Sequence, residues 1–166
     1  MSSDDHAASG ARAQGLDALD RRILRELQQD AGRPLDELAR IVGSSRTPVW
    51  NRIRRMREVG VIGPTTVRVQ PEAVGLDTCF FVLVRTSQHD AEWQARFLQA
   101  LANRPEVIEA HRLAGQIDYI LKLRVKTARD YDHFYQALIA DMKIYSMNAL
   151  LSIEVVKSEG PLPVAD

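Results

Sequence analysis

Residues 34–60 read PLDELARIVGSSRTPVWNRIRRMREVG, and this stretch decides the fold of the N-terminal part of the chain. Its first half has apolar residues at the spacing of one helical face: Leu35, Leu38, Ala39 and Val42. This spacing predicts a short amphipathic helix. Gly43 follows as a turn residue, because glycine adopts backbone angles that a side chain resists.

A second helix is predicted directly after this turn. Ser45 is its expected N-cap, with the hydroxyl accepting a free backbone N–H, and Pro48 lies in the first turn, where a missing N–H costs little. Gly60 is placed to end the helix in a left-handed cap. The buried side is expected to consist of Val49, Ile53 and Met56. Two short helices joined by a tight turn are typical of a helix–turn–helix.

The second helix is unusually basic. Five arginines and no acidic residue lie between Ser45 and Arg57. A folding unit does not need this imbalance, whereas a helix that enters a groove between phosphates does. Arginine also serves both tasks there, as a phosphate clamp and as a bidentate reader of guanine. The alternative is a solvated surface helix that is arginine-rich without a nucleic-acid partner.

Composition places the chain among ordinary globular proteins. It has 166 residues, 45% of them hydrophobic and 27% charged, which suits one or two small domains. No apolar run approaches the roughly 20 residues of a membrane-spanning helix, and the N-terminus lacks the pattern of a secretory signal. The single cysteine, Cys79, fits a reducing cytoplasm and, in its apolar surroundings, predicts a small buried side chain.

Charge is distributed unevenly along a chain with no net charge. Residues 16–70 hold 11 arginines against 7 acidic residues, a net of +4, whereas residues 71–166 hold 10 basic against 13 acidic residues, a net of −3. This asymmetry predicts one domain that faces nucleic acid and a second domain of a different kind.

The predicted organisation has five parts. A tail over residues 1–15 precedes a helix–turn–helix domain at 16–63, whose first helix runs from Ala18 to about Gln29 behind an N-cap at Asp17. Residues 64–76 form a linker with a short strand at 65–69 and a one-turn connector. Residues 77–158 form the second domain, and 159–166 a second tail.

In the second domain, β-forming runs predict strands at 78–86, 107–113, 119–125 and 149–156. Helices are predicted from Ala91 to Asn103, behind Asp90, and from Arg129 to about Met142, behind Thr127. The expected buried faces are Trp93, Phe97, Leu98 and Leu101, and then Tyr131, Phe134, Tyr135, Leu138 and Ile139.

These elements predict an α+β fold. A winged-type helix–turn–helix domain is followed by a ferredoxin-like β-α-β-β-α-β domain. The two helices of such a domain cover one face of the sheet. The other face is left for a partner, commonly another copy of the same chain.

The chain resembles the Lrp/AsnC, or feast/famine, family of bacterial and archaeal regulators over residues 16–157. The matching patterns are Leu19-Asp20-Arg21-Arg22-Ile23-Leu24, Glu37-Leu38-Ala39, Thr47-Pro48, Arg54-Arg55, Gly60-Val61-Ile62 and Ala114-Gly115-Gln116-Ile117-Asp118-Tyr119. Trp50, residues 86–93 and Phe134-Tyr135 are similar to regulators of cysteine breakdown and sulfur amino-acid metabolism.

The chain departs from the family pattern in three places. Gln116 and Ile117 stand where the family has an acid and an aromatic residue, and residues 142–145 replace a Leu-Pro-Gly-Val run. Residues 148–151 are largely apolar where the family has serine and threonine. All three places lie near the family's effector site, so they bear on which effector binds and on whether one binds.

The resemblance implies a sequence-specific regulator of transcription, located in the cytoplasm at the nucleoid, that binds double-stranded DNA as a dimer or a larger tetramer or octamer. Ser45, Arg46 and Thr47 then lie at the DNA-facing end of the second helix. Arg46 and Asn51 are the candidates for base reading, and Arg52, Arg54 and Arg55 for phosphate contacts. Trp50 is a candidate DNA contact, although packing against the first helix explains it equally well.

The expected effector is a small amino acid, with cysteine as the first candidate. The residues implied for its binding are Ala114, Gly115, Gln116, Ile117, Asp118 and Tyr119. Asp118 could hold an ammonium group or simply orient the loop. No other cofactor is expected, nor a metal site, because the histidines are far apart in sequence and have no cysteine nearby.

Two rival functions are open from the sequence. Ferredoxin-like domains also occur in enzymes, but no nucleophile elbow, phosphate loop or pair of catalytic carboxylates stands out here. An architectural DNA-binding protein without an effector is the second rival, and titration with amino acids distinguishes it from a ligand-gated regulator.

Overall fold

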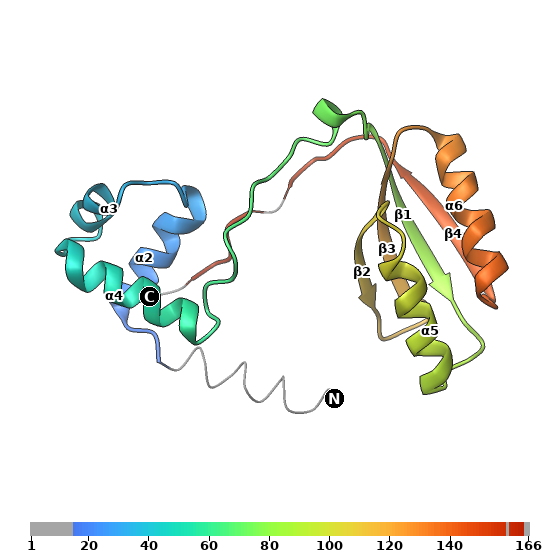
Figure 1. Cartoon of the computed structure of the whole chain (residues 1–166), viewed down its shortest axis with the longest axis horizontal. Coiled ribbons are helices and arrows are strands. Elements are labelled where there is room, and N and C mark those ends of the chain that lie inside the picture. The colour runs from blue at the N-terminus through green and yellow to red at the C-terminus, as the bar shows by residue number, and fades with distance from the viewer. Residues whose placement is uncertain (1–14, 159, 165–166) are drawn as a thin grey trace. The chain divides into compact units, whose positions relative to one another are not determined.

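The computed structural model describes residues 15–158 and 160–164, so most of the predicted N-terminal tail lies outside the described residues. The chain divides into two compact units (Figure 1). The first contains the chain up to Val67 together with the C-terminal tail from Lys157, and the second runs from Arg68 to Val156. The two units meet between Val67 and Arg68.

The first unit is a three-helix domain. Its helices are α2 (Ala18–Gln29), α3 (Leu35–Ile41) and α4 (Arg46–Glu58). The predicted turn glycines, Gly43 and Gly60, both have a positive φ, of 70° and 74°. The core of this unit consists of Ile23, Leu38, Ala39, Val42, Val49, Ile53 and Met56, which confirms the predicted apolar faces.

The N-termini of α2 and α4 differ in how they are capped. The carboxylate of Asp17 accepts the backbone N–H groups of Leu19 and Asp20, and Asp20 in turn accepts the N–H of Asp17, so a complete capping box begins α2. Ser45 is the N-cap residue of α4, as predicted, but its hydroxyl accepts no hydrogen bond from the helix. Only the position of this cap was therefore predicted correctly.

The C-terminal tail docks on α2 within the first unit. The side-chain amide of Gln28 donates to the carbonyl oxygen of Leu162 at 3.3 Å and accepts the N–H of Leu162 at 2.6 Å. Arg25 donates to the carbonyl of Val164 at 3.4 Å. A domain of this size has only a small core of its own. The contacts of the tail with α2 therefore add to the interactions that hold the domain together.

The second unit is a four-stranded antiparallel sheet with two helices on one face (Figure 1). After a short η1 turn (Glu72–Val74), the elements are β1 (Thr78–Arg85), α5 (Ala91–Ala102), β2 (Val107–Arg112), β3 (Tyr119–Val125), α6 (Ala128–Asp141) and β4 (Ser146–Ser152). The strand order is β2-β3-β1-β4. This is the predicted ferredoxin-like arrangement, with β1 and β3 in the centre.

Side chains from both helices and from one face of the sheet form the core of this unit. Phe97 is fully buried, stacks with Trp93 at a ring-centroid distance of 4.9 Å and meets the tilted ring of Tyr119 at 4.8 Å. From α6, Phe134 and Leu138 enter the same cluster. Asp90 and Thr127 cap the two helices as predicted.

Several details correct the sequence prediction. Residues 65–69 form no strand, because a strand needs a ladder partner and the described part of the chain provides none there. The last strand begins at Ser146 instead of residue 149, since pairing with Arg85 of β1 starts there. Leu98 and Ile139 lie at the edges of the apolar faces of their helices and are 50% and 40% exposed.

Candidate nucleic-acid interface

The exposed face of α4 carries most of the residues predicted to contact DNA. Ser45, Arg46, Thr47, Trp50, Asn51, Arg54 and Arg55 are all exposed, whereas Arg52 is only partly so. The buried side of the helix is formed by Val49, Ile53 and Met56. The three-helix core therefore fixes which side of α4 a nucleic acid can reach.

Two arginines of this face make only exposed, easily exchanged contacts. Arg46 lies 3.2 Å from a carboxylate oxygen of Asp36, and Nε of Arg54 lies 3.2 Å from Glu58. The guanidinium of Arg54 also lies over the indole of Trp50, 5.1 Å from the ring centroid. Exposed ion pairs of this kind contribute little to stability, so both arginines are available to a phosphate or a base edge.

Trp50 is 48% exposed and is not one of the buried residues of the three-helix core. About half of the surface of this side chain is therefore accessible to a partner. The indole is presented beside Arg54 on the candidate interface.

Arg52 and Arg55 are held by carboxylates of α2. Arg52 donates to Asp17 at 2.6 Å and to Asp20 at 2.9 Å, and Arg55 donates to the second oxygen of Asp20. Asp20 is fully buried, and a buried carboxylate requires such partners because its desolvation is costly. Two arginines predicted to contact phosphates thus also join α4 to α2.

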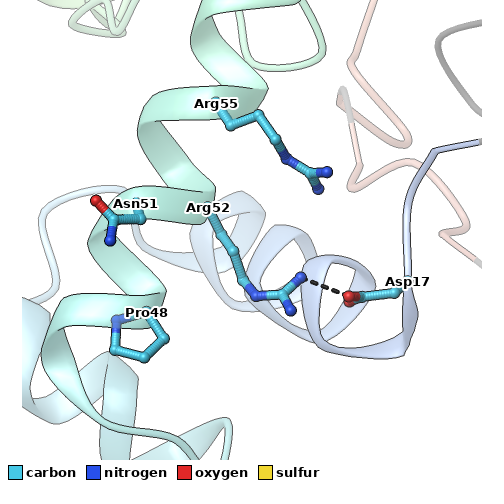
Figure 2. A pocket seen from close by; sticks show the side chains of 5 residues that line it. All are labelled: Asp17, Pro48, Asn51, Arg52 and Arg55. Carbon is cyan, nitrogen blue, oxygen red and sulfur yellow. Dashed lines mark hydrogen bonds and ion pairs between the residues drawn. The ribbon is translucent and has the colours of Figure 1, made fainter.

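Figure 2 shows the concave surface beside this cluster, and we call it the α2–α4 hollow. It has a volume of about 350 Å³ and is lined by Asp17, Pro48, Asn51, Arg52 and Arg55. Arg55 is half exposed at its rim, while the carboxylate of Asp17 meets Arg52 across it (Figure 2). Cationic and anionic groups therefore line the same hollow.

The carboxyl of Asp17 has a lowered pKa. The hydrogen bond from the backbone N–H of Asp20 is the main cause, and the guanidinium of Arg52 adds to it. The two carboxylates in turn raise the pKa of Arg52, Asp20 more than Asp17. A carboxyl whose pKa is lowered by folding stabilises the fold at any pH above its pKa in the unfolded state. This stabilisation is lost as the pH falls through the pKa of the folded state. The pKa shifts of Asp17 and Arg52 therefore keep these two groups ionised at neutral pH.

Asp17 and Asp20 were not identified from the sequence as partners of the arginines. The available signal was an acidic residue beside the apolar stripe of the first helix, since Asp20 lies three residues before the fully buried Ile23. An acid in that place needs a cation from another element, and the arginine-rich helix supplies two.

Five of the six predicted effector residues, 114–118, lie in the loop between β2 and β3, and Tyr119 is the first residue of β3. Gly115 has a φ of 143°, and residues 114–116 are exposed. Tyr119 is buried in the core, where its ring packs at a tilt against Phe97. The six residues are thus contiguous in the chain, but they do not share one surface.

Asp118 fastens this loop to the end of β1. Its carboxylate accepts the N–H of Thr86 at 2.8 Å, and its own N–H donates to the carbonyl of Val84 at 3.0 Å. The other carboxylate oxygen lies 4.0 Å from Nδ1 of His89. These contacts orient the loop, which is one of the two roles considered for Asp118.

A small polar cavity of about 60 Å³ adjoins Asp118. Its lining consists of Gln88, His89, Asp90, Trp93, Gln94, Arg112, Leu113, Asp118 and Tyr119. Typical ligand pockets enclose about 300–1,000 Å³. One chain alone therefore offers only a shallow recess near the effector loop.

Two further observations concern metals and membranes. Among the described residues, no group of three or more histidine, cysteine, aspartate or glutamate side chains is arranged to hold a metal ion. None of the described helices is long and apolar enough to cross a membrane.

Comparison with known protein families matches both units. Residues 16–57 match the AsnC-type helix-turn-helix domain, and residues 79–162 match the Lrp/AsnC ligand binding domain. Together they define a DNA-binding domain followed by a domain for a small ligand.

Individual proteins agree with this result. The glutamate uptake regulatory protein of Zymomonas mobilis is 38% identical over 151 residues, 91% of this chain and 92% of that protein. The DNA-binding transcriptional activator DecR of Escherichia coli is 33% identical over 150 residues, 90% of this chain and 99% of that protein.

The solved structures agree as well. The structure of an AsnC family transcriptional regulator from Agrobacterium tumefaciens has a TM-score of 0.85 at 38% identity, covering 90% of this chain and 97% of that one. A transcriptional regulator of Neisseria meningitidis, solved in complex with L-Met, has the same TM-score and coverage at 23% identity and so shares the fold.

The chain belongs to the Lrp/AsnC family. It is a DNA-binding transcriptional regulator and not an enzyme, as the sequence patterns predicted. The resemblance inferred from the motifs is thereby confirmed.

The ion pairs of Asp20 generate a prediction about stability. Asp20→Asn keeps the size of the side chain and one acceptor oxygen, but it removes the negative charge and places an NH2 donor opposite one of the two arginines. We expect the first unit to lose about 1–3 kcal/mol of free energy of unfolding, measured by hydrogen exchange of the α2 and α4 amides.

Asp36→Asn is the matched control, because its ion pair with Arg46 is exposed on both sides, and we expect it to change the same exchange rates very little. Equal effects of the two substitutions would contradict the role assigned to Asp20.

Proposed function

We propose that the exposed face of α4 reads DNA in the major groove, with Arg46 and Asn51 contacting base edges and Arg54 and Arg55 contacting phosphates. Ser45, Thr47 and Trp50 complete the contact surface. The observation that carries this proposal is the charge of the helix, since the stretch from Arg46 to Arg57 has five arginines and no acid. The buried carboxylate of Asp20 in α2 pairs with Arg55, and this ion pair favours a fixed orientation of the Arg55 guanidinium.

The two classes of arginine predict different losses. Arg54→Ala removes a phosphate contact, so we expect weaker binding to every sequence and a salt dependence of log Kd that is smaller by about 0.9. Arg46→Ala removes a base contact, so we expect a loss of about 1–3 kcal/mol in discrimination at one base pair. Both are measured by fluorescence anisotropy on a selected and a scrambled duplex at several salt concentrations.

Arg129→Ala, an equal loss of charge in the second unit, controls for net charge and should leave both quantities unchanged. An Arg54→Ala protein with wild-type affinity and salt dependence would rule out the phosphate role of Arg54.

We further propose that two chains pair through the sheet face that α5 and α6 leave bare. Phe81 and Leu150 are neighbours on this face, and Leu150 is 49% exposed. An exposed apolar patch is suited to a second protein surface. Pairing of this kind presents two recognition helices to successive major grooves.

Leu150→Asp tests the pairing. A carboxylate on the bare face is tolerated by a monomer but not by a buried interface, so we expect the variant to sediment as a monomer at concentrations where the wild type is a dimer or larger. Leu98→Asp, at an equally exposed position on α5, should keep the wild-type assembly. Dimers of the Leu150→Asp protein would refute the proposed interface.

The second unit is proposed to respond to a small amino acid at the loop of residues 114–118. The recess beside Asp118 is too shallow in one chain, so we place the effector where a neighbouring chain closes it. Three amino acids have specific support: cysteine from the sequence similarity to cysteine-responsive regulators, glutamate from the name of the Zymomonas mobilis relative, and methionine from the L-Met complex with the same fold.

A thermal-shift screen against the common amino acids tests this proposal. A ligand that binds only the folded state raises the melting temperature with its concentration, so we expect a saturable shift with one of the three candidates. Gly115→Val, placed in the loop at a backbone angle that side chains resist, should weaken that shift.

The absence of any shift would favour the rival function, a DNA-binding protein whose second domain only assembles the chains. Since the proposed target is DNA, we also propose that the protein works in the cytoplasm, at the nucleoid.

A further inference from the structure

We propose that Gln28 and the C-terminal tail form a strap that limits the rotation of the DNA-binding unit. The strap thereby narrows the range of half-site spacings that a dimer of this regulator accepts. The inference rests on the proposed function, because it takes α4 to read DNA and two chains to pair. It assigns a specificity-determining role to a residue of α2, outside the exposed face of α4.

The tail is held on α2 through its backbone. The side-chain amide of Gln28 pairs with both polar groups of Leu162, accepting the N–H at 2.6 Å and donating to the carbonyl oxygen at 3.3 Å. Arg25, which precedes Gln28 on α2, donates to the carbonyl oxygen of Val164 at 3.4 Å. The side chain of Leu162 is 74% exposed. Helix α2 therefore recognises the course of the tail backbone and not an apolar anchor.

The sequence of the tail favours this contact. Leu162 lies between Pro161 and Pro163, and proline has a fixed φ and no backbone N–H. The N–H of Leu162 is therefore the only backbone donor of these three residues, and the chain around it has little conformational freedom to lose on docking. The N–H of Val164 also donates to the carbonyl of Leu162, at 2.8 Å. Docking is thus confined to one place on the tail.

Two segments of the chain connect the first unit to the second. The first unit contains the chain up to Val67 and again from Lys157 onward. One connection starts after α4, where Val61 and Ile62 pack against the three-helix core. The other starts from the tail that Gln28 holds on α2. The two connections are therefore anchored on different helices of the same unit.

A second anchor limits rotation. A body on a single tether turns freely about its one attachment point, whereas a second tether attached elsewhere restricts that motion. Both hydrogen bonds of Gln28 with Leu162 are exposed and join neutral groups, and such bonds contribute little individually. The strap is therefore reversible, and one substitution is enough to release it.

Spacing selectivity follows from this restriction. A dimer presents its two recognition helices to half-sites about one helical turn apart. Units on single flexible tethers reach a range of spacings, because the effective concentration of the second unit changes only gradually with the span. Strapped units fit the spacing that matches their restricted orientation, and at other spacings the tail must first leave α2. Affinity is then lowered at the mismatched spacings, which is how specificity can be gained against unwanted sites.

The test compares the wild type with Gln28→Ala and with a chain that ends at Lys157. The half-sites are taken from a duplex that the wild type selects from a random pool. They are moved apart one base pair at a time over one helical turn, and the Kd is measured at each spacing. We expect one preferred spacing for the wild type. Both variants should bind the other spacings several-fold more tightly than the wild type does, which gives a flatter profile.

Three controls separate the strap from damage to the fold. Gln29→Ala removes the same type of side chain at the next, exposed position of α2, and it should keep the wild-type profile. A duplex with one half-site makes no demand on the orientation of the second unit, so every variant should bind it equally well. In the chain that ends at Lys157, adding Gln28→Ala should change nothing further.

The order parameter of the Leu162 amide reports the docking directly. We expect a value of about 0.85 in the wild type, as in rigid backbone, and a value below about 0.6 in Gln28→Ala. A flexible Leu162 in the wild type would overturn the inference, and so would a wild-type spacing profile in the chain that ends at Lys157. A wild type that selects no duplex would refute the proposed function itself, whereas a selective wild type whose profile equals that of the shortened chain would refute only the strap.

Discussion

The carboxylate of Asp20 is the constraint on which the first unit depends. It is fully buried, and it accepts hydrogen bonds from Arg52, from Arg55 and from the backbone N–H of Asp17. An unpaired charge at that depth is costly, so the start of α2 and the middle of α4 stay together. The side of α4 that remains exposed is fixed by the same bonds. A polar contact inside the domain thus acts together with the apolar core to fix which side of α4 stays exposed.

The second unit also leaves one side open, and it does so through its sheet. Phe80, Val82 and Val84 alternate with Phe81 and Leu83 along β1, so one set packs under α5 and α6 while the other faces away. Asp118 fastens the β2–β3 loop at the end of this strand. The loop is therefore well supported, but the recess beside it is small. This combination favours the proposal that another chain completes the effector site, which would couple ligand binding to assembly.

Local signals predicted the fold well, and contacts between distant residues explain what they missed. The caps at Asp17, Asp90 and Thr127 and the turn at Gly43 depend on neighbours within a few residues, which periodicity and residue type reveal. The start of β4 depends on its pairing with Arg85, and the absent strand at 65–69 depends on a missing partner. The roles of Arg52 and Arg55 depend on Asp20, more than 30 residues earlier in the chain. No local pattern of the α4 sequence contains that information.

The arginines of α4 illustrate why charge alone is an incomplete guide to a DNA-binding surface. Arg52 and Arg54 are two positions apart, which places them about 200° apart around the helix. Arg52 consequently lies against α2 and its carboxylates, while Arg54 projects beside Trp50 into solvent. Equal residues of one short basic segment thus take one position inside the domain and one in solvent. Fewer arginines are therefore fully available to a phosphate than the helix contains, and the acids of α2 determine the difference.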